Sequence, residues 1–110
     1  MFKFLEMANN YEERKVDNFT QGDIQVDTAL INDSSKPYET GICHPAYNGG
    51  AWVIVELYNT KEEAQIGHDK WVKIMTSEVL PDTLKDVSTC EFINFRNALF
   101  GKEEIIYKKR

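Results

Sequence analysis

The sequence predicts an α+β domain: an antiparallel β-meander of three to four strands, with one main helix packed across one face and a second helix near the C-terminus. Three observations support this fold class. Short runs rich in β-branched and aromatic residues are separated by turn formers. A long helical pattern begins at the capping box of Thr60 and Glu63, and a second capping box, Ser88 and Glu91, precedes another apolar stretch. A chain of 110 residues is expected to fold as a single domain over residues 1–110.

Strand signals dominate the chain ahead of Thr60. The predicted strands are residues 14–20, 24–31, 38–43 and 52–58. Turn formers lie between them at 21–23, at 32–37 and at 46–50. Connections this short can join only antiparallel neighbours, since parallel strands need long crossovers. The sequence therefore predicts a meander.

The main helix, predicted over residues 61–77, should fold back onto the strand before it, because only two residues connect them. Its apolar residues recur at spacings of three and four, which gives one stripe for packing. We expect Trp71 to anchor this stripe. Alternation along the strand separates two faces, and we expect the aliphatic face to lie beneath the helix. The expected helix side is Val53, Val55 and Leu57, and the opposite side is Trp52, Ile54, Glu56 and Tyr58.

The two ends of the chain carry weaker signals. Residues 1–10 form a short amphipathic segment that either docks on the body or is mobile. Pro81 suits the first turn of a short helix through Leu84 and Val87. The second helix is predicted near Phe92–Phe100, although residues 90–95 could instead form a strand. Residues 102–110 are either a mobile tail or an edge strand.

Composition excludes several classes of function. The net charge is −5, and residues 16–60 carry acids against the single base Lys36, which disfavours nucleic-acid binding. No apolar run is long enough to span a membrane. Cys43 and Cys90 show no framework spacing, so we expect reduced thiols and a cytoplasmic protein. We expect no cofactor.

His68 is the first candidate for chemistry, because it lies on the apolar stripe of the main helix. An imidazole titrates near neutral pH, so it could act as a general base or contact a ligand; a semi-buried structural histidine is the simpler interpretation. Tyr58 and Trp71 are the residues we expect to line a pocket with it. No catalytic triad can be placed from sequence. Zinc ligation by Cys43, His44, His68 and Cys90 is disfavoured by their spacing, so no metal site is expected.

The second face of the strand at 52–58 needs a cover of its own. Trp52, Ile54 and Tyr58 are expected to lie there, while the helix occupies the other face. Exposed apolar patches of this kind mark interaction surfaces. We therefore predict an interface at these residues and a homo-oligomer.

Two resemblances add to this interpretation. The segment ELYNTKEEAQIGH, Glu56 to His68, resembles the strand-to-helix segment of dimeric α+β barrel proteins. That resemblance implies paired ferredoxin-like subunits that hold small organic molecules between sheet and helices. The stretches NYEERKV, VDTALINDSSKPYETGICHPAYN and WVIVELYNTKEEAQIGHDKWVKIMT look like small uncharacterised proteins of tailed bacteriophages, which implies action in a bacterial host cytoplasm.

We therefore predict a phage-type, non-enzymatic binding protein that self-associates, either a virion accessory or a binder of a host factor or defence signal. Its further partner would be a host protein or a small molecule. The alternative is a small-molecule enzyme or ligand-binding protein of the dimeric α+β barrel type that uses His68. Only the alternative requires an enclosed pocket at His68.

Overall fold

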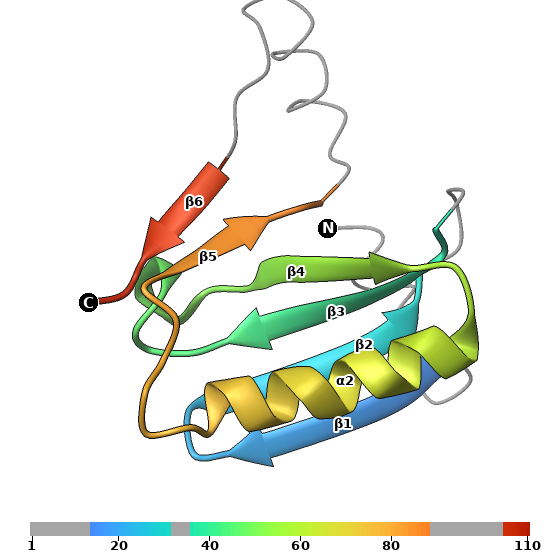
Figure 1. The fold of residues 1–110 in the computed structure, drawn as a ribbon, viewed down its shortest axis with the longest axis horizontal. Helices are drawn as coiled ribbons and strands as arrows, with labels where there is room; N and C mark the ends of the chain where they lie inside the picture. The colour runs from blue at the N-terminus through green and yellow to red at the C-terminus, as the bar shows by residue number, and fades with distance from the viewer. Residues whose placement is uncertain (1–13, 32–35, 89–104) are drawn as a thin grey trace, which may run out of the picture.

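Four strands form an antiparallel sheet in the computed structural model, which describes residues 14–31, 36–88 and 105–110 (Figure 1). The strands are β1 (Lys15–Gln21), β2 (Ile24–Leu30), β3 (Tyr38–Cys43) and β4 (Val53–Tyr58). Their order in the sheet, β1-β2-β3-β4, is their order in the chain, and every neighbouring pair is antiparallel. The predicted α+β class and the meander are confirmed.

Short turns account for this topology. The β1–β2 hairpin has a two-residue loop that begins with Gly22 at φ 60, a left-handed conformation that glycine adopts without steric cost. Between β3 and β4, Asn48–Gly50 forms a short 3₁₀ helix, η1. Both lie where the sequence predicted turns.

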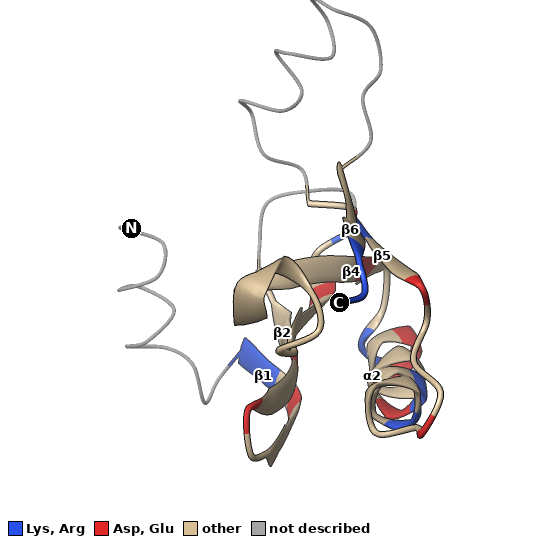
Figure 2. Cartoon of the chain, turned by 90° about the vertical axis from the view of Figure 1, so that its left-hand side faces the viewer, with Lys and Arg blue, Asp and Glu red and all other residues tan. Residues whose placement is uncertain are grey.

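The main helix, α2 (Lys61–Met75), begins where its capping box predicts. The Thr60 hydroxyl accepts a hydrogen bond from the Glu63 backbone N–H at 3.1 Å. Glu62 and Glu63 lie in the first turn, where the helix dipole favours negative charge. Figure 2 shows α2 as a separate layer on one side of the sheet.

A β-bulge in β4 overturns the predicted assignment of its faces. Thr40 pairs with Glu56, but the next residue of β3, Gly41, pairs with Ile54, so Val55 is an extra residue in the ladder. The bulge changes the side to which the residues before it point. As a result Val53 shares the helix side with Glu56 and Tyr58.

The correction affects both predicted faces. Leu57 lies on the side away from α2, and Tyr58 lies beneath the helix, where its phenol ring packs against Gly67. Trp52 and Ile54 do lie together on the opposite side, where both are close to Gly41. A prediction that assumes regular alternation along the whole strand could not assign these side chains to the correct faces.

A second, two-stranded sheet lies beside β4 (Figure 1). Its strands are β5 (Thr83–Asp86) and β6 (Ile105–Lys108), and the Val87 N–H donates to the Ile54 carbonyl oxygen at 2.8 Å. The short helix predicted from Pro81 through Leu84 is therefore wrong, because pairing with β6 favours an extended backbone. The edge-strand interpretation of the C-terminal residues is confirmed.

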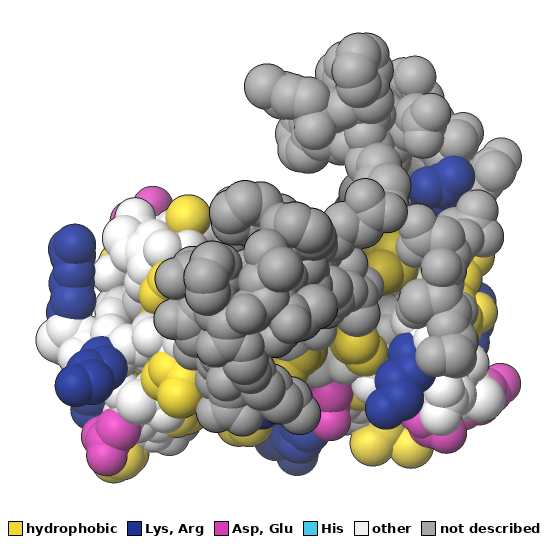
Figure 3. Space-filling view, turned by 90° about the horizontal axis from the view of Figure 1, so that it is seen from above, with side chains coloured by type: hydrophobic (Ala, Val, Ile, Leu, Met, Phe, Trp, Pro, Cys, Tyr) yellow, Lys and Arg dark blue, Asp and Glu magenta, His cyan; other side chains and the backbone are white. Residues whose placement is uncertain are grey.

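The core lies between the sheet and the C-terminal half of α2. Its buried members are Val26, Ile42, Tyr47, Val53, Val55, Met75 and Leu84. Trp71 is only half-buried at its margin, so Met75 rather than Trp71 is the most enclosed large apolar side chain of the helix. On the described part of the face in Figure 3, hydrophobic side chains lie beside Lys, Arg, Asp and Glu side chains.

Some predictions fall outside the described residues. These are the N-terminal segment at 1–10, the second helix near Phe92–Phe100 and the surroundings of Cys90. Among the helices that the structure does describe, none combines the length and apolarity needed to cross a bilayer.

Candidate functional site

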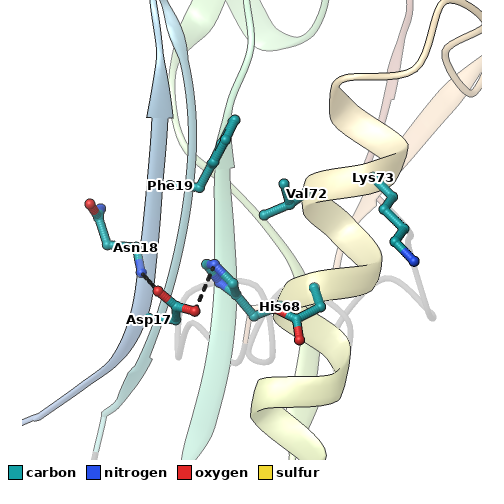
Figure 4. Close-up of a pocket in the computed structure, with 7 residues that line it drawn as sticks. Asp17, Asn18, Phe19, His68, Val72 and Lys73 are labelled. Carbon is teal, nitrogen blue, oxygen red and sulfur yellow. Dashed lines mark hydrogen bonds and ion pairs between the residues drawn. The ribbon is translucent and has the colours of Figure 1, made fainter.

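An open cleft of about 450 Å³ lies between β1 and α2 (Figure 4). It is lined by Asp17, Asn18, Phe19, His68, Asp69, Val72 and Lys73. In Figure 4, Phe19 and Val72 point into the space between strand and helix, whereas Lys73 extends away from it. The cleft thus combines an apolar wall with two carboxylates and an imidazole.

His68 forms the buried side of this cleft. Its side chain is only 2% exposed, because it projects from α2 towards the sheet. Nδ1 lies 2.8 Å from the Thr28 hydroxyl oxygen on β2. Nε2 faces Asp17 Oδ2 on β1 across 3.8 Å, which is too long for a hydrogen bond. The imidazole therefore has one nitrogen anchored in the core and one directed to the cleft.

Behind His68, a chain of hydroxyl groups crosses the sheet beneath the helix. The Thr28 and Thr40 hydroxyl oxygens are 2.6 Å apart, and Thr40 Oγ1 lies 3.0 Å from the Tyr58 hydroxyl. Tyr58 then donates to Glu56 Oε1 at 3.1 Å. Both threonines are fully buried, and Tyr58 is 5% exposed. Such a network is stabilising only if each member is satisfied, and here each has a partner.

The chain of hydroxyl groups ends at a carboxylate, which can only accept, and this fixes the direction of every hydrogen bond in the chain. Each hydroxyl has one proton to donate. Since Tyr58 gives its proton to Glu56, Thr40 must donate to Tyr58, and Thr28 must donate to Thr40. Thr28 can then only accept, so His68 Nδ1 carries the proton in that bond. In the neutral imidazole this leaves the Nε2 lone pair directed towards the cleft.

Glu56 closes the far end of the chain with three donors. Besides Tyr58, its Oε1 accepts from Trp71 Nε1 at 2.9 Å and from Lys70 Nζ at 2.7 Å. Burial acts to raise the pKa of Glu56, but the hydrogen bonds from Lys70, Trp71 and Tyr58 outweigh it, and the pKa is lowered. Burial raises the pKa of the Tyr58 hydroxyl. The chain therefore ends on a carboxylate that stays ionised and a phenol that keeps its proton.

Asp17 closes the near end, at the mouth of the cleft. Gln65 Nε2 donates to Asp17 Oδ2 at 2.9 Å and to Asp69 Oδ1 at 3.1 Å, so one amide links the two carboxylates. The Asn18 backbone N–H donates to Asp17 Oδ1 at 2.7 Å. The hydrogen bond from Gln65 is the main cause of the lowered pKa of Asp17.

The three predicted ligand-binding residues belong to one hydrogen-bonded network, and of the three only His68 is among the residues that line this cleft. His68 lines the cleft, Tyr58 lies under Gly67, and Trp71 joins them through Glu56. Sequence reasoning missed Asp17, Thr28, Thr40 and Glu56. The signal for Thr28 was a polar side chain in line with Val26 and Leu30 on an otherwise apolar strand face.

Of the four residues considered as zinc ligands, Cys43, His44 and His68 lie in the described ranges. Cys43 is buried, and burial raises the pKa of its thiol. His44 Nδ1 accepts from the Ala46 N–H at 3.0 Å, and burial lowers the pKa of the ring. Within the described ranges, no three histidine, cysteine or acidic residues are arranged to hold a metal ion.

Comparison with known proteins gives no relative: no family model, curated protein or solved structure matches this chain. Interpretation of the site therefore depends on its own geometry.

Proposed function

We propose that this chain is a non-enzymatic binding protein, and that its ligand site is the cleft between β1 and α2. The observation that carries the proposal is the composition of that cleft. An apolar wall at Phe19 and Val72 faces the polar groups of Asp17 and His68 across a space of about 450 Å³. Small-molecule sites typically combine a hydrophobic lining with a few placed polar groups, in volumes of about 300–1,000 Å³.

The hydrogen-bonded chain supports binding rather than turnover. It fixes the His68 ring from behind, while the side chain stays 2% exposed. When the side chains that contact a ligand are already fixed, less conformational entropy is lost on binding. The resemblance to tailed-phage proteins remains a prediction; it extends the proposal to a host factor or defence signal as the natural ligand.

Two-dimensional NMR with a small set of cationic, neutral and anionic aromatic fragments tests this proposal. We expect at least one class to give saturable shifts at the backbone amides of Asp17, Asn18, Phe19 and Val72. Val72→Trp, which fills the cleft from its apolar wall, should abolish those shifts while the remaining spectrum stays folded. The proposal fails if no class gives saturable shifts there.

Self-association is proposed for the opposite side of the sheet. Trp52, 45% exposed, packs with Ile54 over Gly41 on the side away from α2. A second copy of the chain could cover this pair. Light scattering should show that Trp52→Ser reduces the assembled mass, while Ile66→Ser on the exposed side of α2 does not; a monomer at high concentration for the unmodified chain would remove this part of the proposal.

The enzymatic alternative, of the dimeric α+β barrel type, is favoured by one observation. The chain from Glu56 to His68 orients Nδ1–H inward and leaves Nε2 as a potential general base at the cleft. In that case His68→Gln should abolish turnover of a bound ligand without abolishing its binding.

A further inference from the structure

Two hydrogen-bond acceptors face each other at the mouth of the cleft. The direction of the buried chain places the proton of a neutral His68 on Nδ1, so Nε2 presents a lone pair. Opposite it, at 3.8 Å, lies Asp17 Oδ2, a carboxylate oxygen that can only accept. Asp17 Oδ2 already accepts from Gln65 Nε2 at 2.9 Å, whereas His68 Nε2 forms no hydrogen bond among the described residues. The pair would be stabilised by a donor that reaches both.

We infer that the cleft selects a cationic hydrogen-bond donor, a primary ammonium group carried on a small apolar or aromatic body. A nitrogen can lie about 2.9 Å from each of two acceptors that are 3.8 Å apart. A charged donor forms stronger hydrogen bonds to these groups than a neutral one. The inference rests on the proposed function and specifies its ligand class.

The rest of the cleft matches such a ligand. Phe19 and Val72 point into the space and offer an apolar surface to its body (Figure 4). Asp69 adds a second carboxylate, held near Asp17 by the shared Gln65 amide. Lys73 also lines the cleft but extends away from the imidazole, so its charge is directed away from the ammonium position (Figure 4).

Three related compounds test this inference in NMR titrations of the full chain. Phenethylamine supplies both charge and N–H donors, N,N,N-trimethylphenethylammonium supplies charge without donors, and 2-phenylethanol supplies a neutral hydroxyl. We expect phenethylamine to bind at least about tenfold more tightly than either of the others.

Two variants locate the effect. Asp17→Asn keeps the shape of the side chain and removes its charge, and should weaken phenethylamine at least about tenfold. Asp82→Asn, at a carboxylate whose side chain is 97% exposed and lies outside the cleft, should leave the affinity unchanged. The Asp17→Asn spectrum shows directly whether the variant is folded.

The outcomes separate this inference from the proposed function. Equal affinity for all three compounds at the cleft amides would overturn the ammonium inference and leave the cleft as a binding site. An unchanged affinity in folded Asp17→Asn would overturn it as well. If no cationic, neutral or anionic fragment gives saturable shifts at the amides of the cleft, the proposed function itself is overturned.

Discussion

Tyr58 packs directly against Gly67, so closely that a Cβ atom at this helix position would overlap with the phenol ring. The contact brings α2 near the sheet at the point where the Tyr58 hydroxyl joins Thr40 and Glu56. Glycine at 67 is thus required for the approach that encloses the network.

Gly67→Ala should destabilise the protein by about 2–3 kcal/mol, because overpacking forces backbone or ring to shift. At an exposed helix position the same change would stabilise by about 1 kcal/mol, so the sign of the effect is decisive. Urea unfolding measures it. Ile66→Ala, at a neighbouring side chain that is 72% exposed, should change the unfolding free energy by no more than about 0.5 kcal/mol. A stabilised Gly67→Ala variant would contradict the close approach.

Tyr58→Phe should cost about 1–3 kcal/mol, since it leaves the buried Thr40 hydroxyl without its acceptor and removes a donor to Glu56. Tyr38 is the cross-strand partner of Tyr58, and its hydroxyl makes no hydrogen bond within the part of the chain the structure describes. Tyr38→Phe is therefore the matched control and should be near neutral. Equal effects of the two substitutions in denaturant unfolding would argue against the chain of hydroxyls.

Glu56→Gln should make the free energy of unfolding less dependent on pH in the acidic range. The folded-state pKa of Glu56 lies below its ordinary value near 4.5, so its ionised form stabilises the folded state above that pH, and the contribution is lost as the pH falls through the folded pKa. The stability difference between wild type and variant should be largest near pH 7 and shrink below about pH 4.5. Thermal unfolding at a series of pH values measures it, and a difference that grows on acidification would oppose the assignment.

Trp71 contributes both a donor and packing, and two substitutions separate them. Trp71→Phe keeps an aromatic ring against the core margin but removes the hydrogen bond to Glu56, at a cost of about 1–2 kcal/mol. Trp71→Ala should cost more, up to about 3–5 kcal/mol. Melting temperatures should fall in that order; an unchanged melting temperature for Trp71→Ala would refute the packing of this helix.

Features set by neighbouring residues were predicted from the sequence. The strand at Tyr38–Cys43 and the helix start after Thr60 agree with the structure, because turn formers and a capping hydroxyl act within a few residues. Pairing over long separations was not predictable. The approach of β6 makes β5 a strand, although Pro81 suggested a helix start.

The candidate site was predicted in part for the same reason. His68 was conspicuous as a polar residue on an apolar helix stripe. Thr28 and Thr40 were not, because threonine favours strands and the sequence cannot show which hydroxyls meet across a sheet. The position of Tyr58 depended on the bulge, which leaves no local signal in WVIVELY.

The extra residue in β4 decides to which face of the sheet the side chains before it point. If β4 kept all its residues but paired without the bulge, so that Val55 lay opposite Gly41, the alternation would run unbroken back from Tyr58, and Ile54 and Trp52 would turn towards α2 while Val53 turned outward. One inserted amino acid thus decides which aromatic ring the helix covers and which remains at the surface.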